Sequence, residues 1–248
     1  MSQWKKNIWI GTSNIVIPGN KQSFPQPYNS KSRLHYYAFL FDTVEINQTF
    51  YKLPKPSTFE RWAAEVRDDF KFTVKLTRDV THVKNLQANL DLIDTFLYAA
   101  NRLQDKKGCL LLQFPGKITL EYFNEVEAIL EKIDAADETG QWKKAVEFRH
   151  MSWYTGETYE MLDRFNAALV IHDMPKSKII ENYTAAPFVY MRFHGMAGDY
   201  KGSYPDDILQ QKAKQIINWA KEGKEVYVYF NNTIGEAFNN ARSLIEML

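Results

Sequence analysis

The sequence predicts an α/β fold, because short apolar runs alternate with amphipathic segments along its 248 residues. The apolar runs have the length of buried strands and span residues 8–12, 43–47, 71–75, 109–114, 144–148, 168–173, 188–194 and 226–230. No linker rich in Gly, Ser or Pro divides the chain. Eight strands that alternate with helices over about 250 residues match a (β/α)8 TIM barrel. We therefore expect a single domain over residues 1–248.

The segments between these runs carry apolar residues at helical spacing. Residues 92–103, 208–220 and 234–248 are clear examples, with apolar side chains three or four positions apart. Ser57 to Glu60 has the spacing of a capping box, which predicts the start of a further helix. Residues 174–187 leave little room for a full helix, so we expect an irregular sixth crossover. A doubly wound open sheet is the alternative, but the Gly-rich turn typical of its nucleotide-binding members is absent.

Composition narrows the classes of function. The chain has 31 Lys and Arg against 30 Asp and Glu, which gives a formal charge of +1 and disfavours a nucleic-acid partner. Cys109 is the single cysteine, which excludes an intramolecular disulfide and a cysteine zinc site. We expect its side chain to serve in packing. The chain lacks an apolar leader and any apolar stretch of roughly 18 residues. We expect a cytoplasmic protein with a small-molecule substrate and no membrane partner, in an oligomeric state that the sequence leaves open.

Alternation within each run assigns its side chains to two faces. Val44 and Ile46 are typical of the apolar face, and polar residues occupy the other face. The polar residues gather near the carboxyl ends of the runs, where barrel enzymes build their active sites. They are Glu45, Asn47, Lys75, Gln113, Glu147, Arg149, Asp173, Arg192, His194, Tyr229 and Asn231. Burying an unpaired charge costs several kcal/mol, so these residues form either a functional site or a self-neutralised structural network of carboxylates and cations.

Our leading hypothesis is an enzyme that acts on a small polar or anionic metabolite by general acid–base chemistry. The candidate catalytic residues are Glu45, Glu147, Asp173 and His194, whose imidazole ordinarily titrates near pH 6.5. The candidate substrate-binding residues are Asn47, Lys75, Gln113, Arg149, Arg192, Tyr229 and Asn231. The planar forks of Arg149 and Arg192 suit a carboxylate or phosphate, and the amide side chains suit hydroxyls or amides.

Two alternatives use the same end of the strands. A divalent-metal isomerase or phosphodiesterase would draw ligands from Glu45, Glu147, Asp173, His150 and His194. The nearby cations and the absence of a paired-histidine motif disfavour it, so no cofactor is predicted. A non-catalytic module would bind a ligand or nucleic acid through the aromatic residues at 50–51, 153–154 and 200–204.

Motifs at the ends of the runs extend from residue 8 to residue 244. They are GTS at 11–13, TVEINQTFY at 43–51, TH at 81–82, LQFP at 112–115, EFRHMSW at 147–153, DMP at 173–175, RFHG at 192–195, YKGSY at 200–204 and YFNN at 229–232. Together they resemble the YecE-like family, a TIM-barrel family of unknown function. The resemblance implies a barrel and a shared polar pocket, but no reaction. The implied pocket holds Glu45, Asn47, Lys75, Glu147, Arg149, Asp173, Arg192, His194 and Asn231.

The first motif departs from the family pattern. The family usually has Gly-Trp after Gly-Thr-Ser, whereas this chain has Asn14 and Ile15. A loop near the expected site has therefore lost a glycine and an indole.

Overall fold

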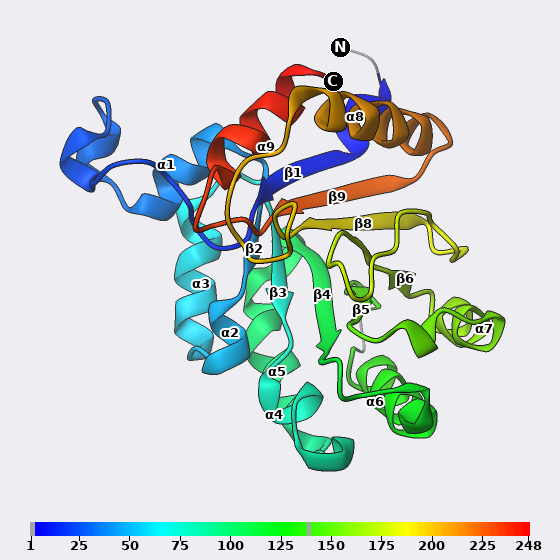
Figure 1. Ribbon diagram of the computed structural model, residues 1–248. Coiled ribbons are helices and arrows are strands. Elements are labelled where there is room, and N and C mark those ends of the chain that lie inside the picture. Colours follow the sequence, from blue (N-terminus) through cyan, green and yellow to red (C-terminus); the bar gives the residue numbers. More distant parts are fainter. Residues whose placement is uncertain (1–2, 138–139) are drawn as a thin grey trace.

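The computed structural model describes residues 3–137 and 140–248, and its strands are parallel (Figure 1). One sheet has the order β1-β9-β8-β7 and the other has the order β2-β3-β4-β5-β6. The strands of the first sheet are β1 (Ile8–Thr12), β7 (Ile171–His172), β8 (Phe188–Phe193) and β9 (Glu225–Phe230). Those of the second are β2 (Thr43–Ile46), β3 (Lys71–Lys75), β4 (Lys107–Phe114), β5 (Lys143–Phe148) and β6 (Ala168–Leu169). The predicted α/β fold is confirmed.

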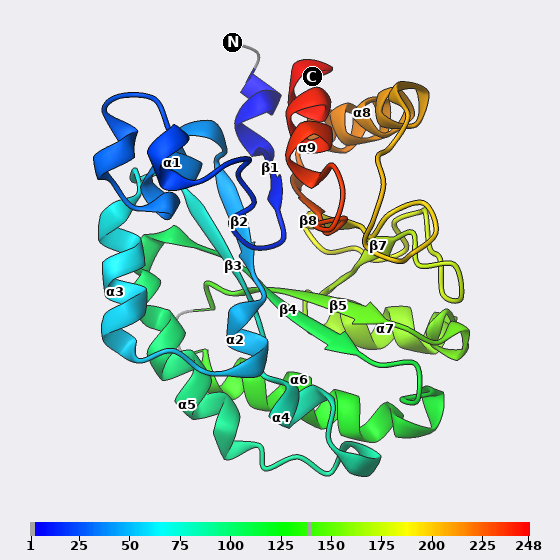
Figure 2. The ribbon, with the colours of Figure 1, turned by 60° about the vertical axis from the view of Figure 1, so that its left-hand side comes forward.

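Helices surround the strands, which occupy the centre of the molecule (Figure 2). The α-helices are α1 (Arg33–Leu40), α2 (Gln48–Tyr51), α3 (Pro56–Glu65), α4 (Arg78–Thr81), α5 (Asp91–Ala100), α6 (Phe123–Ala136), α7 (Gly156–Arg164), α8 (Asp206–Lys221) and α9 (Ala237–Glu246). Short 3-10 helices are η1 (Gln3–Asn7), η2 (Lys21–Ser23), η3 (Tyr28–Ser30), η4 (Lys84–Leu86), η5 (Asn101–Lys106), η6 (Leu120–Tyr122) and η7 (Met151–Trp153). Helix α3 begins at Pro56 without a side-chain cap, so the predicted capping box is wrong. Proline fits the first helical turn because its φ is preset and its missing N–H is not needed there.

The two sheets approach each other at both edges. The sixth predicted strand is split at Val170, so that β6 pairs with β5 while β7 pairs with β8. The amide of Val170 donates to the carbonyl of Val146 at 2.9 Å, which keeps the chain in contact with β5 at the switch. At the other edge, Ser13 forms a parallel bridge with Glu45 on β2. This arrangement is consistent with a TIM-like barrel.

The connection from β7 to β8 is irregular, as predicted. Residues 173–187, all of which the structure describes, contain no helix. Instead the chain folds back, and Ile179 forms an antiparallel bridge with His172 through two hydrogen bonds of 3.0 Å.

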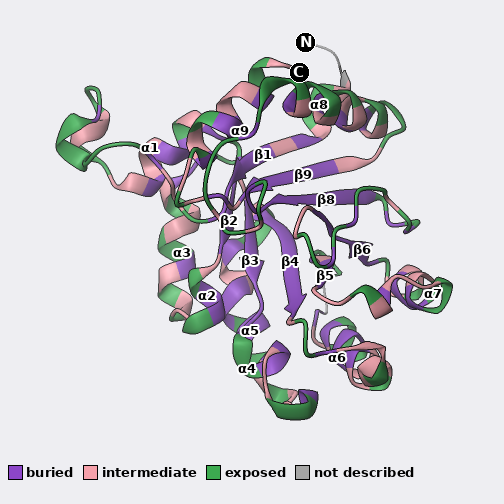
Figure 3. Cartoon of the chain, viewed as in Figure 1, coloured by how far each residue is buried: buried purple, intermediate pink, exposed green. Residues whose placement is uncertain are grey.

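The apolar side chains form two separate clusters, one on each face of the strands. One contains Val44, Val146 and Val228 together with helix residues such as Phe96 and Leu209. The other contains Cys109, Leu111, Ala145, Tyr190, Tyr227 and Tyr229. The predicted alternation and the predicted packing role of Cys109 are therefore confirmed. Figure 3 shows buried strands in the centre and exposed residues on the outer faces of the helices.

Candidate functional site

Polar side chains from both sheets meet at the carboxyl ends of the strands. We call this group the strand-end cluster, and it consists of Glu45, Lys75, Gln113, Glu147, Arg149, Asp173, Arg192 and His194. Six of these residues are buried, whereas the Arg149 side chain is 13% exposed and the Asp173 side chain is 20% exposed. Each residue lies at the end of its strand or in the first residues after it. The alternation in the sequence therefore brings these residues together as expected.

Arg192 on β8 joins the two sheets through a buried ion triad. Its Nη2 donates to Oε1 of Glu45 at 2.8 Å, and its Nη1 donates to Oε2 of Glu147 at 2.7 Å. All three side chains are at most 1% exposed. Burial alone would raise the pKa of each carboxyl, but Arg192 and the other donors outweigh it and lower both values. The carboxylates in turn raise the pKa of Arg192, against the effect of its burial. All three groups are therefore charged at neutral pH.

Further donors occupy the remaining carboxylate lone pairs. Ser13 Oγ donates to Glu45 at 2.6 Å, Asn47 Nδ2 donates at 3.1 Å, and Tyr190 donates its phenolic hydrogen. Glu147 also accepts from Nε of Arg149. Both carboxylates are thus fully engaged in holding arginines and loops in place, which leaves them poorly suited to carry protons at neutral pH.

His194 is held between Arg149 and Asp173. Nη2 of Arg149 lies 3.0 Å from Nε2 of the imidazole. Because arginine only donates, this contact assigns the imidazole proton to Nδ1, which lies 3.4 Å from Oδ1 of Asp173. Burial lowers the pKa of His194, while Glu147 and Asp173 oppose this effect. The imidazole is therefore neutral at pH 7, and its Nδ1 lies next to Asp173 outside hydrogen-bonding geometry.

Tyr204 fixes Asp173 and the loop after β8. Its hydroxyl donates to Oδ2 of Asp173 and accepts from the amide of Gly195 at 2.6 Å. Gly195 has φ +92°, and a Cβ there would lie 2.6 Å from the carbonyl oxygen of Lys201. Glycine is thus required at this turn. Asp173 also accepts the amide of His194 at 2.8 Å, so one phenol orients the whole turn.

We expect Tyr204→Phe to destabilise the protein by about 1–3 kcal/mol, because it leaves the buried amide of Gly195 without its acceptor and Oδ2 of Asp173 without its donor. Urea-induced unfolding monitored by fluorescence measures this change. Tyr51→Phe is the matched control, since Tyr51 is 69% exposed and its substitution should change stability by less than about 0.5 kcal/mol. Equal effects of the two substitutions would contradict the anchoring role of Tyr204.

Lys75 differs from the other cations of the cluster. Its Nζ donates to Oε1 of Gln113 at 2.8 Å and lies 4.1 Å from the ring centroid of Phe50. Within residues 3–137 and 140–248, no carboxylate forms an ion pair with it. Burial, aided by the charge of Arg192, lowers the pKa of Lys75 to about 7. Lys75 therefore exists in both protonation states near neutral pH.

Three predicted site residues are not members of this cluster. Asn47 and Asn231 are half-buried, and Nδ2 of Asn47 donates to Oε1 of Glu45 at 3.1 Å. Tyr229 lies on the inner face, where its hydroxyl contacts Thr43 at 2.7 Å and Thr73 at 2.8 Å. The phenol of Tyr229 is thereby occupied within the apolar cluster, and the structure does not bring it to the strand-end cluster.

Four of the residues proposed as metal ligands lie in the strand-end cluster, and the fifth, His150, has another role. Nδ1 of His150 accepts from the amide of Ser152 at 3.2 Å and thus serves as a helix cap. Among the described residues, no three His, Cys, Asp or Glu side chains form a group that could hold a metal ion.

Sequence reasoning missed Ser13 and Tyr190 as residues that shape the site, and it named Phe50 and Tyr204 only as aromatic residues of a binding module. Tyr190 had a usable signal, because it shares the strand face of Arg192 two residues away. Ser13 and Tyr204 lie within the motifs at 11–13 and 200–204, but their partners are distant in the sequence.

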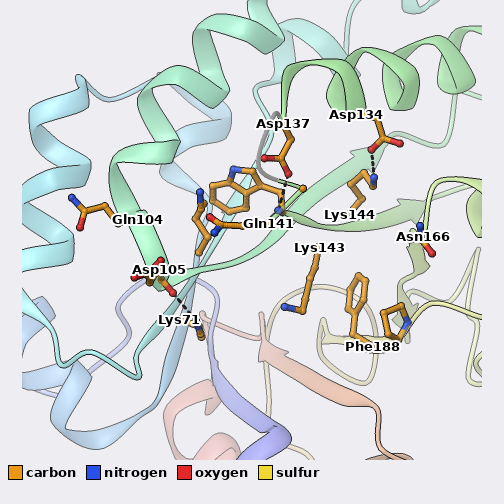
Figure 4. A pocket seen from close by; sticks show the side chains of 14 residues that line it. Lys71, Gln104, Asp105, Asp134, Asp137, Gln141, Lys143, Lys144, Asn166 and Phe188 are labelled. Carbon is orange, nitrogen blue, oxygen red and sulfur yellow. Dashed lines mark hydrogen bonds and ion pairs between the residues drawn. The ribbon is translucent and has the colours of Figure 1, made fainter.

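A pocket of about 840 Å³ lies at the opposite, amino ends of the strands (Figure 4). Its lining includes Lys71, Lys107 and Lys143, which begin β3, β4 and β5. Several of its lysines have partners, as Nζ of Lys143 lies 3.2 Å from Glu225 and Nζ of Lys71 donates to the carbonyl of Asp105 at 2.6 Å. The pocket is separate from the strand-end cluster.

The family model described as a protein of unknown function, DUF72, matches residues 1–248. The chain belongs to the DUF72 family. Two curated relatives are similar to it. UPF0759 protein YecE of Escherichia coli K12 is 33% identical over 132 residues, which are 53% of this chain and 47% of that protein. UPF0759 protein YunF of Bacillus subtilis 168 is 25% identical over 256 residues, with 91% of this chain and 89% of that protein covered.

Solved structures of DUF72 proteins share the fold. A crystal structure from Enterococcus faecalis V583 superposes with a TM-score of 0.79 at 22% identity, covering 97% of this chain and 95% of that one. A second, from Thermotoga maritima MSB8, has a TM-score of 0.74 at 26% identity, covering 97% and 98%. The match to the E. coli protein spans about half of that relative's length. None of the described helices has the length and apolar composition needed to cross a membrane.

Proposed function

We propose that this DUF72 protein is a cytoplasmic enzyme that acts on a small anionic metabolite by acid–base chemistry, at the carboxyl ends of a closed (β/α)8 barrel. The bridge between Ser13 and Glu45 and the switch at Val170 support closure, because they connect the edges of the two sheets. The strand-end cluster lies at the end of the strands where barrel enzymes carry their active sites.

The observation that carries the proposal is the division of the cluster into a fixed floor and an outer pair of cations. Arg192 pairs with both Glu45 and Glu147, and these three residues form the floor. Arg149 and Lys75 are the outer pair, because they are more exposed, at 13% and 8%, than the residues of the floor. Among the described residues, Arg149 uses two of its five guanidinium hydrogens, for Glu147 and His194, which leaves three for a ligand. A bound carboxylate or phosphate fits this geometry best.

The proposed roles follow from these contacts. Arg149 binds the anionic group of the substrate, and Lys75 moves the proton, since its pKa of about 7 matches the operating pH. Gln113 holds the amine of Lys75. His194, held neutral by its environment, provides an uncharged hydrogen-bonding group between Arg149 and Asp173. Asn47 and Asn231, which are half-buried, bind substrate hydroxyls or amides.

A melting-temperature screen tests the proposal with sugar phosphates, sugar acids, amino acids and nucleotides. A ligand at 100 times its dissociation constant stabilises by about 2.7 kcal/mol, which should raise Tm by roughly 5–10 °C at this chain length. We expect Arg149→Met to abolish the shift measured against its own unliganded Tm. Arg102→Met is the control, because Arg102 is 42% exposed on η5 and should retain the full shift. A shift that survives Arg149→Met would locate the ligand elsewhere.

A further inference from the structure

We infer that Lys75 is a nucleophile that forms an imine with the carbonyl carbon of a small aldehyde or ketone bearing an anionic group. The inference rests on the proposed function and names its substrate class.

The first argument is the environment of the amine. Lys75 is only 8% exposed, yet among the described residues it has an amide oxygen and an aromatic ring as neighbours instead of a carboxylate. A buried lysine with a purely structural role is ordinarily paired with an acid, as Arg192 is paired twice in the same cluster. The contact with Gln113 fixes the position of Nζ without neutralising an opposite charge.

The second argument is the charge around the amine. Arg192 and Arg149 both disfavour an additional cation at Nζ, and Glu45 and Glu147 favour one. Both carboxylates are already paired with arginines, so the effects of burial and of the two arginines outweigh theirs and the pKa of Lys75 is lowered. His82 adds no opposing negative charge, since burial and the charge of Lys75 lower its own pKa to about 4. With a pKa of about 7, roughly half of the Lys75 side chains carry a free lone pair at neutral pH.

The step itself needs no oxidant or reductant. The Nζ lone pair attacks the carbonyl carbon, and the π electrons move to oxygen, which then takes one of the two amine hydrogens to give a carbinolamine. Loss of that oxygen as water and of the amine hydrogen leaves the C=N bond. Arg149 would hold the anionic group of the substrate. A lysine that is neutral at pH 7 is suited to this chemistry, in contrast to an ordinary surface lysine.

Reductive trapping with glyoxylate and cyanoborohydride tests the inference on the intact chain. Glyoxylate combines an aldehyde with a carboxylate, and hydride reduction of its imine leaves a carboxymethyl group that peptide mass spectrometry locates. At pH 7 we expect Lys75 to be modified at least tenfold faster than Lys201, whose side chain is 62% exposed. Only about one in 10³ ordinary lysines is neutral at that pH, and the advantage should shrink by pH 10.

Three comparisons sharpen the result. Lys75→Met and Lys75→Arg should abolish the modification at this position, and an unchanged melting profile would show that each variant is folded. Glycolaldehyde is similar in size but neutral, and we expect it to lose most of the preference for Lys75. Modification of Lys75 no faster than of Lys201 at pH 7 overturns the inference. If that occurs while a metabolite still raises Tm through Arg149, the proposed function stands and the imine chemistry alone fails.

Discussion

Arg192→Leu is expected to lower the free energy of unfolding by about 3–5 kcal/mol, because it leaves two buried carboxylates without their shared cation. At this chain length the corresponding fall in Tm is roughly 6–20 °C. Leucine keeps much of the apolar volume of the arginine stem, so lost charge pairing dominates over lost packing. Urea-induced unfolding at pH 7 measures the effect.

A rescue variant separates the effect of the lost charge in Arg192→Leu from the effect of the changed side-chain shape. Combining Arg192→Leu with Glu45→Gln and Glu147→Gln removes both uncompensated charges, and we expect it to recover part of the lost stability. Arg149→Met should have a smaller effect than Arg192→Leu, since Arg149 is 13% exposed and Glu147 retains Arg192. A loss below about 1 kcal/mol in Arg192→Leu would contradict a buried, stabilising triad.

Stability should fall as the pH drops from about 6.5 to about 4, and His172 should contribute much of this loss. Burial lowers the pKa of His172 from 6.5 to about 4. Below pH 6.5 the unfolded chain binds a proton that the folded chain does not, so stability decreases by up to about 1.4 kcal/mol per pH unit until the folded pKa is reached. The total is about 3 kcal/mol at most.

Unfolding free energies at pH 7.5, 6.5, 5.5 and 4.5 measure this slope. We expect His172→Gln to be less stable at pH 7.5, because the imidazole contacts the carbonyl of Phe148 and the amide of Met174, but to have a shallower pH dependence. The carboxyls contribute in a separate window. The pKa values of Glu45 and Glu147 are lowered, so their stabilisation is lost only as the pH falls below about 4.5. Parallel curves for wild type and His172→Gln would rule out His172 as the source.

The sequence predicts those parts of the fold that depend on neighbouring residues alone, namely the bounds of single strands and the face that each side chain occupies. Alternation places Glu45 and Val44 on opposite faces whatever the rest of the chain does, and β1 and β3 begin and end where predicted. The break at Val170 was not predicted, because one unbroken apolar run covers both β6 and β7. Which sheet a short strand joins depends on neighbours that are distant in the sequence.

The membership of the site was also largely predictable, whereas the pairing within it was not. The sequence predicts that Arg192 faces a ligand. Instead, its guanidinium group donates to Glu45, which lies 147 positions away in the sequence. Tyr229 pairs in register with Arg192 and faces the same side of the sheet, yet its hydroxyl contacts Thr43 and Thr73 instead of the cluster. The alternation of residues along a strand predicts which face of the sheet a side chain occupies. It does not predict which distant side chain will form its hydrogen bonds. For the same reason the sequence could not show that Lys75 lies without an ion pair, because this depends on Glu45 and Glu147 pairing with arginines instead.

The internal pairing of the strand-end cluster also determines how far its influence extends into solution. Glu45, Glu147 and Asp173 nearly cancel Arg149, Arg192 and Lys75, and the whole chain carries a formal charge of only +1. An ion one Debye length away, about 8 Å at physiological ionic strength, therefore senses almost no field from the site. Substrates would arrive by unguided diffusion, at a rate that added salt hardly changes. Selection among metabolites would then take place only on contact, by the fit of an anion to Arg149 and of a reactive carbon to Lys75.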